Sequence, residues 1–402
     1  MDEIKPLKLK PGIKRKIGKY WLLVPLFLVV LFAAWWKSDS GSPSVVSFVF
    51  GLGSTLKTDN GRVNILLLGI AGGNHEGPNL TDTIMVASAD VKSHQTDLIS
   101  LPRDLWVDEH KAKINTLYQI GLSRGSGLDL AKNEIGDMLG IKIPYAVRVD
   151  FNGFIKAVDL VGGLDVNIER SFDDYSYPVP GKENELCGYK EEELDVSEEE
   201  GETLGVEPGK LKVLMDPEGK IATAAAKPGA GFIFTDQQVF DLFPCRFEHL
   251  SFTNGKTQMD GSTALKFVRS RHGTNTEGTD FARSKRQQLV LQAFRENVLS
   301  LGTLSDLSKV TGLIKTLGAS VESNIPVAQY PEFIKLVKGS QETKSFVLDT
   351  SGKDPLLVAP PTWQYGAWVL IPPDNDFAKI HQYISDIFSG KLSASESAGK
   401  KQ

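Results

Sequence analysis

An uncharged apolar segment near the N-terminus constrains this chain more than any other feature. Residues 20–36, YWLLVPLFLVVLFAAWW, run seventeen positions without a charged side chain. As a helix rising about 1.5 Å per residue, the segment would span roughly 25 Å, close to the thickness of a bilayer's hydrocarbon core. Residues 1–20 hold seven Lys and Arg against two acids. Because positive flanks stay in the cytoplasm, the pattern predicts a basic cytoplasmic tail over 1–19 and a transmembrane signal anchor over 20–36.

Two other interpretations of the segment fit less well. A cleaved signal peptide would use small residues such as Ala33 and Ala34, but two Trp residues follow them instead of an A-x-A site. A buried globular helix is disfavoured because apolar residues surround the whole helix. We therefore expect a single-pass protein of the cytoplasmic membrane, with the N-terminus inside and most of the chain outside. An exported compartment permits disulfides, and the sequence leaves open whether Cys187 and Cys245 pair or stay free.

The exported part has the pattern of an α/β or mixed fold, with one main domain that contains an insertion. Residues 37–60 indicate a juxtamembrane linker. Short β-rich runs follow, several of them apolar throughout, as in strands covered on both faces. They cover residues 63–69, 83–90, 97–102, 145–150 and 164–169. Helical spacing predicts helices at 128–139, at 151–158 (capped by Asp150 or Asn152 and stopped by Gly162 and Gly163) and at 280–299.

Two further regions differ in composition from this pattern. Residues 182–230 are rich in Glu, Gly and Pro, with eleven acids against one Lys in 183–207. They predict a mobile acidic insertion in a loop, either a solvated surface or a metal-binding segment. Residues 301–390 predict a C-terminal α/β extension packing on the domain, and 391–402 a disordered tail. The expected helices of this C-terminal extension are 304–317, 326–338 and 376–388, and its expected strands lie near 344–349 and 366–371. Outside the basic tail and the insertion the charge is near zero, so no nucleic acid is expected as a partner.

A set of closely spaced arginines is the strongest indication of chemistry. The motifs KFVRSRHG and DFARSKRQQ contain Arg269, Arg271, Asp280, Arg283, Arg286 and Gln287. On a helix at 100° per residue, the last four of these fall within an arc of about 120°. Arginine holds phosphate oxygens through two parallel N–H groups, so several arginines converging on one point match a pyrophosphate. The alternative is surface pairing with acids, and the clustering weighs against it.

A second candidate group lies around the end of a predicted strand. In SLPRDLW, Arg103 and Asp104 follow the strand at its C-terminal end, where ligand sites of α/β sheets form. Asp82, in NLTDTIM, stands just before the neighbouring strand. An acid beside arginines can hold a divalent cation that shares phosphate oxygens. The alternative for Asp82 is a turn or capping residue.

Three other patterns are set aside. GLSRG at 121–125 fits G-x-S-x-G, but Ser123 lacks the strand-turn-helix context of a nucleophile. The six histidines are scattered without metal-ligand spacing, so the sequence indicates no zinc site. The glycines after the first strand match neither G-x-G-x-x-G nor a Walker motif and are a weak nucleotide signal.

Six motifs stand in one order along residues 62–300. They are VNILLLG, LTDTIM, LISLPRDLW with KINTLY, DFNGFIKAVDLVGGLDVNI, MDGSTALKFVRSRHG and DFARSKRQQ. This series resembles the LytR-CpsA-Psr family of bacterial envelope proteins, with the acidic insertion between its halves. The resemblance implies a catalytic domain over 61–300 with a mixed central β-sheet flanked by helices. It also implies an apolar pocket for a polyprenyl chain and an arginine-lined mouth for its pyrophosphate.

The resemblance further implies an activity. Proteins of this family are held to transfer glycopolymers, such as teichoic acid or capsular polysaccharide, from a polyprenyl-pyrophosphate carrier to peptidoglycan through a phosphodiester link. Such phosphoryl transfer needs positioning and charge neutralisation, which arginines and Mg²⁺ (or Mn²⁺) provide without a nucleophilic side chain. The implied phosphate-binding residues are Arg103, Arg269, Arg271, Arg283, Arg286 and Gln287. Asp82 would bind the metal, and Asp104 and Asp280 would orient arginines or assist proton removal, so that Arg103, Asp104, Asp280 and Arg283 form the catalytic set.

One position departs from the family pattern. Ala71 stands where the family usually has an acid as second metal ligand. Either Asp82 holds the metal with help from Asn74, His75 or Glu76, or the metal binds weakly. Two rival functions use the same residues: hydrolysis of the pyrophosphate, and a non-catalytic lipid-binding regulatory role, which Ala71 favours. The expected partners are a polyprenyl-pyrophosphate-linked glycan, peptidoglycan and the lipid bilayer.

Overall fold

The computed structural model describes residues 55–73, 75, 77–300, 317–340 and 342–392. The predicted tail, the anchor at 20–36, most of the linker and nearly all of the predicted helix 304–317 lie outside these residues. Within the described ranges, no helix combines the length and the apolarity needed to cross a membrane. The chain divides into two compact units, and the boundaries fall within strands β7 (Leu164–Ile168) and β13 (Gly255–Met259) and helices α8 (Gly261–Arg269) and α9 (Asp280–Ser300).

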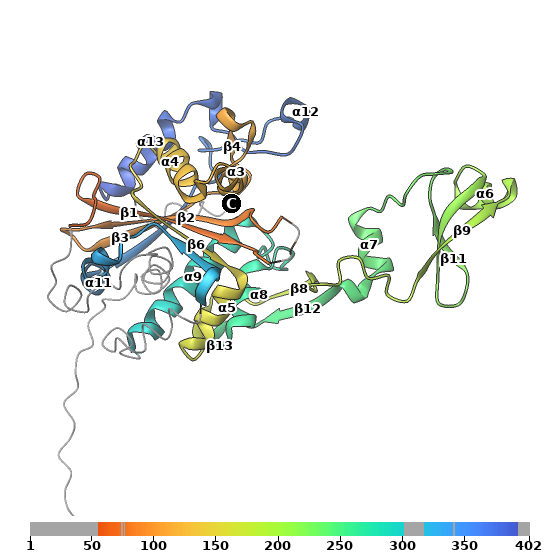
Figure 1. The fold of residues 1–402 in the computed structure, drawn as a ribbon, viewed down its shortest axis with the longest axis horizontal. Helices are drawn as coiled ribbons and strands as arrows, with labels where there is room; N and C mark the ends of the chain where they lie inside the picture. The colour runs from red at the N-terminus through yellow and green to blue at the C-terminus, as the bar shows by residue number, and fades with distance from the viewer. Residues whose placement is uncertain (1–54, 74, 76, 301–316, 341, 393–402) are drawn as a thin grey trace, which may run out of the picture. The chain divides into compact units, whose positions relative to one another are not determined.

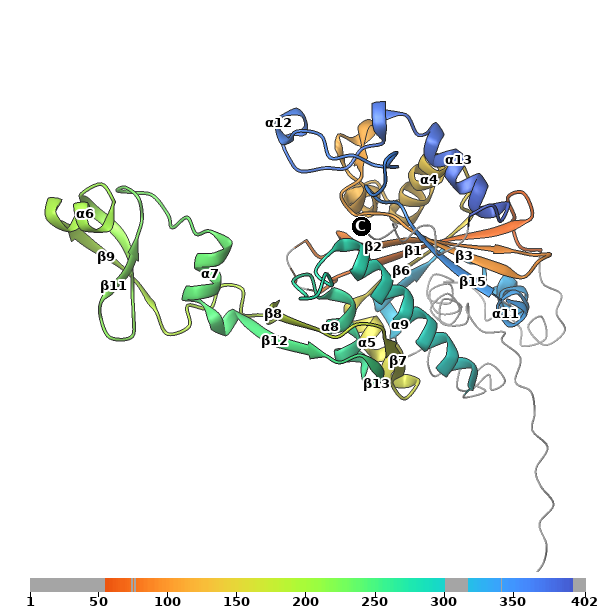
Figure 2. The same ribbon diagram turned by 180° about the vertical axis from the view of Figure 1, so that it is seen from behind.

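The first unit is built on a six-stranded mixed sheet, seen from two sides in Figures 1 and 2. Its order is β14 (Val321–Ser323), β6 (Tyr145–Asp150), β1 (Arg62–Ile70), β2 (Thr81–Asp90), β3 (Gln95–Ser100) and β15 (Glu342–Val347). Strand β1 runs antiparallel to β2 and parallel to β6, while β3 runs antiparallel to β2 and parallel to β15. The predicted class, an α/β fold with a mixed central sheet, is confirmed.

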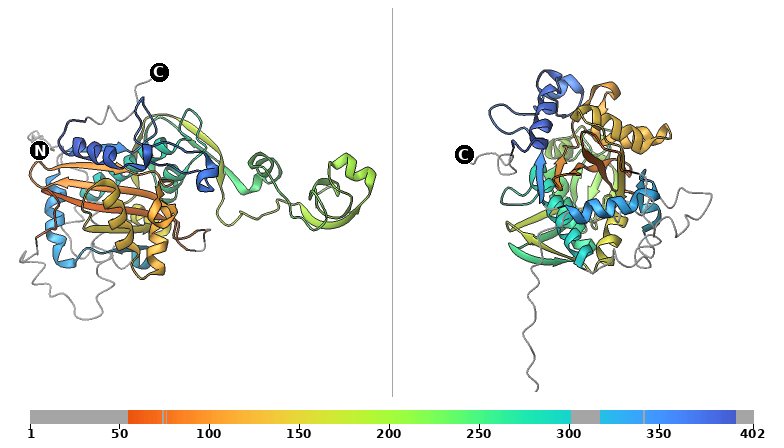
Figure 3. Two further views of the ribbon diagram at one scale, coloured as in Figure 1. Left: turned by 90° about the horizontal axis from the view of Figure 1, so that it is seen from above. Right: turned by 90° about the vertical axis from the view of Figure 1, so that its left-hand side faces the viewer.

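Helices cover both faces of this sheet, which explains why its strands are apolar throughout. On one face, Leu66, Leu68 and Ile70 of β1 belong to a buried cluster shared with α3 (Leu117–Ser123), α4 (Gly127–Leu139) and α13 (Ala378–Phe388). The alternate residues Val63 and Ile65 are also buried. Helix α11 (Tyr330–Gly339) lies on the opposite side from α4 and α13, and the end-on view in Figure 3 shows helices on both faces.

The helix signals in the sequence act as expected. Asp150 precedes α5 (Phe151–Leu160), and its Oδ1 accepts a hydrogen bond from the Gly153 N–H at 2.8 Å. Gly162 and Gly163 follow α5 with φ of +79° and +85°, a conformation that favours glycine. Helices α4, α9, α11 and α13 agree with the predicted ranges to within a few residues.

Residues beyond 300 are part of the central sheet. Strand β14 pairs antiparallel with β6, and β15 pairs parallel with β3, so this region forms both sheet edges. This differs from an extension that packs on a finished domain. The strand expected at 366–371 is wrong: Leu370 and Ile371 make isolated bridges to Leu105 and Val358. Two prolines follow Ile371 directly, and because proline lacks an N–H a longer ladder cannot continue there.

The second unit contains the acidic insertion, which is folded. A ribbon of β8 (Phe172–Pro178) and β12 (Phe247–Phe252) leads to an antiparallel sheet of β9 (Lys190–Val196), β10 (Gly209–Met215) and β11 (Ile221–Ala224). The expectation of an irregular loop is wrong for these residues. Leu211 and Val213 are buried, while the alternate residues Lys210 and Lys212 are exposed, so strand alternation gives the acidic segment a small core with Val196.

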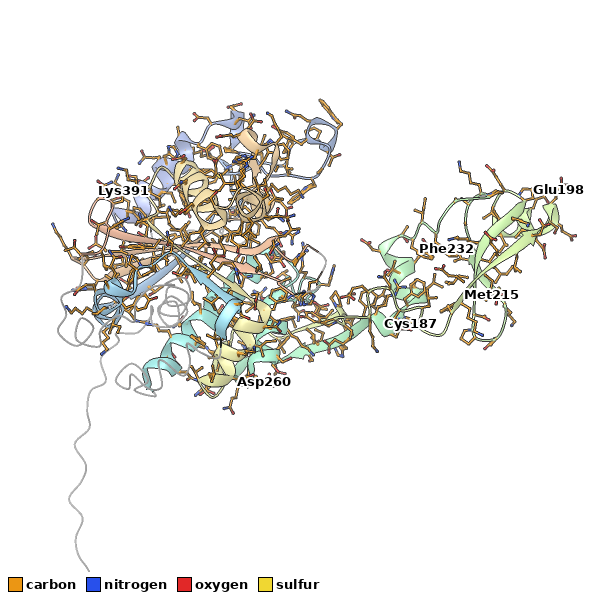
Figure 4. All side chains as sticks on the ribbon, viewed as in Figure 1. Cys187, Glu198, Met215, Phe232, Asp260 and Lys391 are labelled. Atoms are coloured by element: carbon orange, nitrogen blue, oxygen red, sulfur yellow. A yellow bond between two sulfur atoms is a disulfide. The ribbon has the colours of Figure 1, made fainter. Side chains whose placement is uncertain are left out.

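The two cysteines form a disulfide in the second unit. Cys187, labelled in Figure 4, is bonded to Cys245 with the Cα atoms 5.6 Å apart and a sequence separation of 58. The bond closes the insertion and settles the pairing that the sequence left open. The remaining short elements are β4 (Trp106–Val107), β5 (Ala112–Lys113), β7 (Leu164–Ile168), β13 (Gly255–Met259), α6 (Glu198–Leu204), α7 (Asp236–Leu242) and α12 (Thr362–Tyr365).

Candidate functional site

Arg103 and Asp82 meet at one end of the central sheet. Asp82 is the second residue of β2, and Arg103 follows the end of β3 by three positions. Because β2 and β3 are antiparallel, with Met85 opposite Ser100, the start of β2 lies beside the end of β3. Arg103 Nη1 donates to Asp82 Oδ1 at 2.6 Å. The structure therefore brings together two residues that are 21 positions apart and were predicted to act together.

Part of the Arg103 guanidinium has no partner within the described chain. Its Nε is buried and makes no hydrogen bond, and the nearest carboxylate oxygen, Asp104 Oδ2, is 3.9 Å away. The side chain as a whole is 23% exposed, so solvent reaches another part of it. A buried donor left unpaired costs free energy, and an anion is the strongest acceptor for it. The Arg103 side chain is thus fixed by Asp82 through Nη1, while its exposed part can contact a ligand.

Asp104 and Lys113 form a second ion pair beside Arg103. Lys113 Nζ, on β5, donates to Asp104 Oδ1 at 2.6 Å, and the Asp104 side chain is only 10% exposed. This geometry favours the orienting role predicted for Asp104 over proton removal, which requires access to an acceptor hydroxyl. Lys113 was missed as a site residue. The available signal was its position at the start of KINTLY, one of the motifs of the family resemblance.

The residues around Asp82 fit a magnesium ion held by one carboxylate. Asp82 is 36% exposed, and its Oδ2 makes no hydrogen bond or ion pair to the described part of the chain. Ala71, the departure from the family pattern, is buried. Of the proposed substitutes, Asn74 and Glu76 lie outside the described residues, and the His75 ring packs edge-on against Phe151 at 5.9 Å. Mg²⁺ commonly takes one or two carboxylates and completes its shell with water and phosphate oxygens.

Arg286, in the second unit, is fixed by its own unit. Its Nε donates to the Phe267 carbonyl at 2.8 Å, Nη2 to the Ser270 carbonyl at 2.5 Å, and Nη1 to both the carbonyl and Oε2 of Glu277 at 2.7 and 2.9 Å. The residue is 2% exposed, and burial lowers its pKa, against the opposing effect of Glu277. Four hydrogen bonds occupy most of its N–H groups. Arg286 therefore positions the 270–277 segment instead of binding phosphate through two parallel N–H groups.

Asp174 completes this support. It is fully buried, and its Oδ2 accepts from the Ser270 hydroxyl at 2.6 Å and from the His272 N–H at 3.3 Å. Arg286 and Asp174 therefore hold Ser270 from two sides and fix the backbone between Arg269 and Arg271. Asp174 was not predicted, because two adjacent acids in a short strand before the acidic insertion have no distinguishing pattern.

The remaining predicted residues of the second unit differ in their environment. Arg269 Nη1 donates to the Tyr177 hydroxyl at 3.2 Å, and burial raises the pKa of that tyrosine. Arg283 is 8% exposed and pairs through Nη2 with Asp280 Oδ1 at 2.9 Å. Asp280 is therefore placed where it could orient Arg283, and its role in orienting arginines or assisting proton removal stays a prediction. Arg271 is exposed and Gln287 is half-buried.

The fold and these clusters define a class of protein: a mixed α/β domain with an arginine–carboxylate cluster at one end of its sheet. The model of the LytR_cpsA_psr family matches residues 38–381, and the chain belongs to this family. The match extends well beyond residue 300, in agreement with the sheet edges contributed by that region.

Three similar proteins are informative. The regulatory protein MsrR of Staphylococcus aureus is 25% identical over 67% of this chain and 58% of its own length. The polyisoprenyl-teichoic acid–peptidoglycan teichoic acid transferase TagV of Bacillus subtilis is 23% identical over 72% of this chain and 57% of its own. The chain thus spans less than two thirds of these relatives. The crystal structure of protein gbs0355 from Streptococcus agalactiae superimposes with a TM-score of 0.51 at 18% identity, over 82% of this chain and 88% of that one. That similarity concerns the fold alone.

Proposed function

We propose that the protein is a membrane-anchored phosphotransferase that moves a glycopolymer from a polyprenyl-pyrophosphate carrier to peptidoglycan. The observation that carries this proposal is the Arg103 guanidinium, pinned by Asp82 through one nitrogen and left with an unpaired buried N–H. Family membership and the similarity to TagV, a teichoic acid transferase, support the same reaction. The uncharged segment at 20–36 is proposed as the anchor, which would keep the enzyme beside a substrate confined to the bilayer.

Each unit holds its own proposed phosphate ligands and supporting residues. In the first, Arg103 binds phosphate, and Asp104 and Lys113 hold the adjoining backbone and charge in place. In the second, Arg269, Arg271, Arg283 and Gln287 are proposed as phosphate ligands, with Asp280 orienting Arg283. Arg286 supports the segment that carries two of these arginines. The acceptor hydroxyl attacks the phosphorus attached to the glycan, and its proton passes to Asp280 or to solvent. The bond between this phosphorus and the bridging oxygen of the pyrophosphate breaks, and polyprenyl phosphate leaves.

Mg²⁺ or Mn²⁺ is the proposed cofactor. Asp82 Oδ2 would hold it, and the bound ion would neutralise charge that develops on the phosphate oxygens. The Asp82–Arg103 contact then serves a second purpose, because it fixes the carboxylate in one orientation.

The test uses the full-length protein in detergent micelles with a synthetic polyprenyl-pyrophosphate glycan, Mg²⁺ and peptidoglycan fragments. Mass spectrometry follows the coupled glycan and the released polyprenyl phosphate. Arg103→Ala should lower turnover by about 100-fold or more, because one contact to developing charge is worth roughly 3 kcal/mol. Arg124→Ala, at an exposed arginine of the same unit, is the matched control and should keep full activity. Equal loss in both variants, or full activity in Arg103→Ala, would remove the basis of the proposal.

Two rival functions predict other products. A pyrophosphate hydrolase releases polyprenyl phosphate without coupled glycan. A non-catalytic lipid-binding regulatory protein binds the donor and releases nothing. The similarity to the regulatory protein MsrR and the apolar Ala71 favour this second candidate. The same experiment therefore separates all three.

A further inference from the structure

Three potential metal ligands meet away from the phosphate-binding candidates. Glu109 and His110 belong to a short 3-10 helix, Asp108–His110, and Glu134 lies on α4. One nitrogen of His110 and one oxygen of each glutamate all lie within 4.8 Å of one another. The His110 side chain is only 6% exposed, and its Nε2 is buried with no hydrogen-bond partner in the described part of the chain.

The contact between His110 and Glu134 is close without being a hydrogen bond. His110 Nε2 lies 3.2 Å from Glu134 Oε1, yet the two groups are not aligned for proton sharing. The pair His249–Asp173 of the second unit provides the comparison, because its Nε2 and Oδ1 form an aligned hydrogen bond at 2.9 Å. A shared proton explains the second pair, whereas the first has the distance of an ion pair but leaves the buried His110 Nε2 without an aligned hydrogen bond.

A bound transition-metal ion explains the first pair. Zinc lies about 2.0–2.2 Å from imidazole nitrogen and carboxylate oxygen, so two ligands of a tetrahedral ion are separated by about 3.3–3.6 Å. The observed separation of 3.2 Å is slightly shorter than this interval, so a small shift of the Glu134 carboxylate would admit the ion. Imidazole with two carboxylates suits Zn²⁺ and poorly suits Mg²⁺, which prefers oxygen ligands and retains its water.

We propose that Glu109, His110 and Glu134 bind one Zn²⁺ ion, with water completing its coordination. This site is separate from the magnesium proposed at Asp82 and does not depend on the transferase activity. It would tie the 3-10 helix to α4. The loop so restrained lies directly between β4 and β5, and β5 carries Lys113, the partner of Asp104. The ion would thus stabilise the segment that presents the first-unit cluster.

The sequence did not indicate this site for a definite reason. His110 and Glu134 are 24 positions apart and come from different elements, so no ligand spacing within one helix or loop marks them. The site exists only because α4 packs beside the loop that follows β4.

The test measures zinc binding by full-length protein stripped with a chelator. Isothermal titration and elemental analysis should give one tightly bound Zn²⁺ per chain, and Zn²⁺ should raise the melting temperature. His110→Gln and Glu134→Gln should each weaken binding by at least about tenfold. His249→Gln, which removes the histidine of the comparison pair, should bind as the native protein does.

Glu109→Gln guards against a folding artefact, because Glu109 is exposed and its replacement leaves the core unchanged. It should also weaken zinc binding, with an unchanged circular dichroism spectrum. Absence of zinc uptake by the native chain would overturn the proposal. Uptake that survives both His110→Gln and Glu134→Gln would overturn it as well, since the ion would then lie elsewhere.

Discussion

Replacing Arg286 by Leu should destabilise the protein before it affects phosphate binding. The side chain makes four hydrogen bonds, three of them to backbone carbonyls and one to the Glu277 carboxylate. Phe267 and Ser270 are 1% and 0% exposed, so water cannot replace the lost donors at their carbonyls. Breaking a buried pair in this way typically costs about 3–5 kcal/mol, and the individual bonds are not additive. We expect a loss of about 4 kcal/mol in the free energy of unfolding.

Urea denaturation and hydrogen exchange of residues 270–279 measure this effect. The matched control is Lys285→Leu, one residue earlier on the same helix, where the lysine forms an exposed pair with Glu169. An exposed pair is worth little, so the control should stay within about 1 kcal/mol of the native protein. The reasoning is refuted if Arg286→Leu keeps native stability and exchange protection and yet loses donor binding, because Arg286 would then act as a ligand.

Three further predictions concern other parts of the chain. Removing the Cys187–Cys245 bond with paired Ser substitutions opens a 58-residue loop, for which chain entropy predicts a loss of about 4 kcal/mol; limited proteolysis should cut residues 188–244 faster, and an unchanged digestion pattern would contradict this. Asp82→Asn should raise the Mg²⁺ concentration for half-maximal turnover at least about tenfold, and an unaltered titration would exclude Asp82 as the ligand. Burial lowers the pKa of Arg295 to about 9, below its value in the unfolded chain. The buried charge therefore destabilises the folded state in full below about pH 9, and this destabilisation decreases as the pH rises above 9. Arg295→Met should therefore add about 1–3 kcal/mol of stability at pH 7.5 and less at pH 10, whereas a destabilised variant would count against that account.

Sequence patterns predicted the strands and helix ends that depend on neighbouring residues. Apolar runs indicated strands buried on both faces, and Asp150 with Gly162 and Gly163 set the ends of α5. The sheet edges could not be predicted in the same way, because β14 and β15 pair with strands more than 170 residues earlier in the sequence. The acidic sheet was missed for another reason. The alternation of Leu211 and Val213 with lysines was present, but the overall charge of the segment outweighed it in the interpretation.

The candidate site shows why arginine spacing alone does not assign roles. On the helix surface Arg283 and Arg286 share one face, and nothing in their spacing distinguishes them. Their partners do distinguish them, since Arg286 uses four bonds on backbone carbonyls and a carboxylate that no sequence pattern reveals. Arg103 is the opposite case, because one bond to Asp82 leaves a buried N–H unsatisfied. A guanidinium whose donors are consumed stabilises its surroundings, whereas one with donors to spare can gain free energy only from a ligand. On this criterion, Arg103→Ala should impair glycopolymer transfer and leave the free energy of unfolding nearly unchanged. Arg286→Leu should do the reverse, because it should lower the free energy of unfolding before it affects phosphate binding.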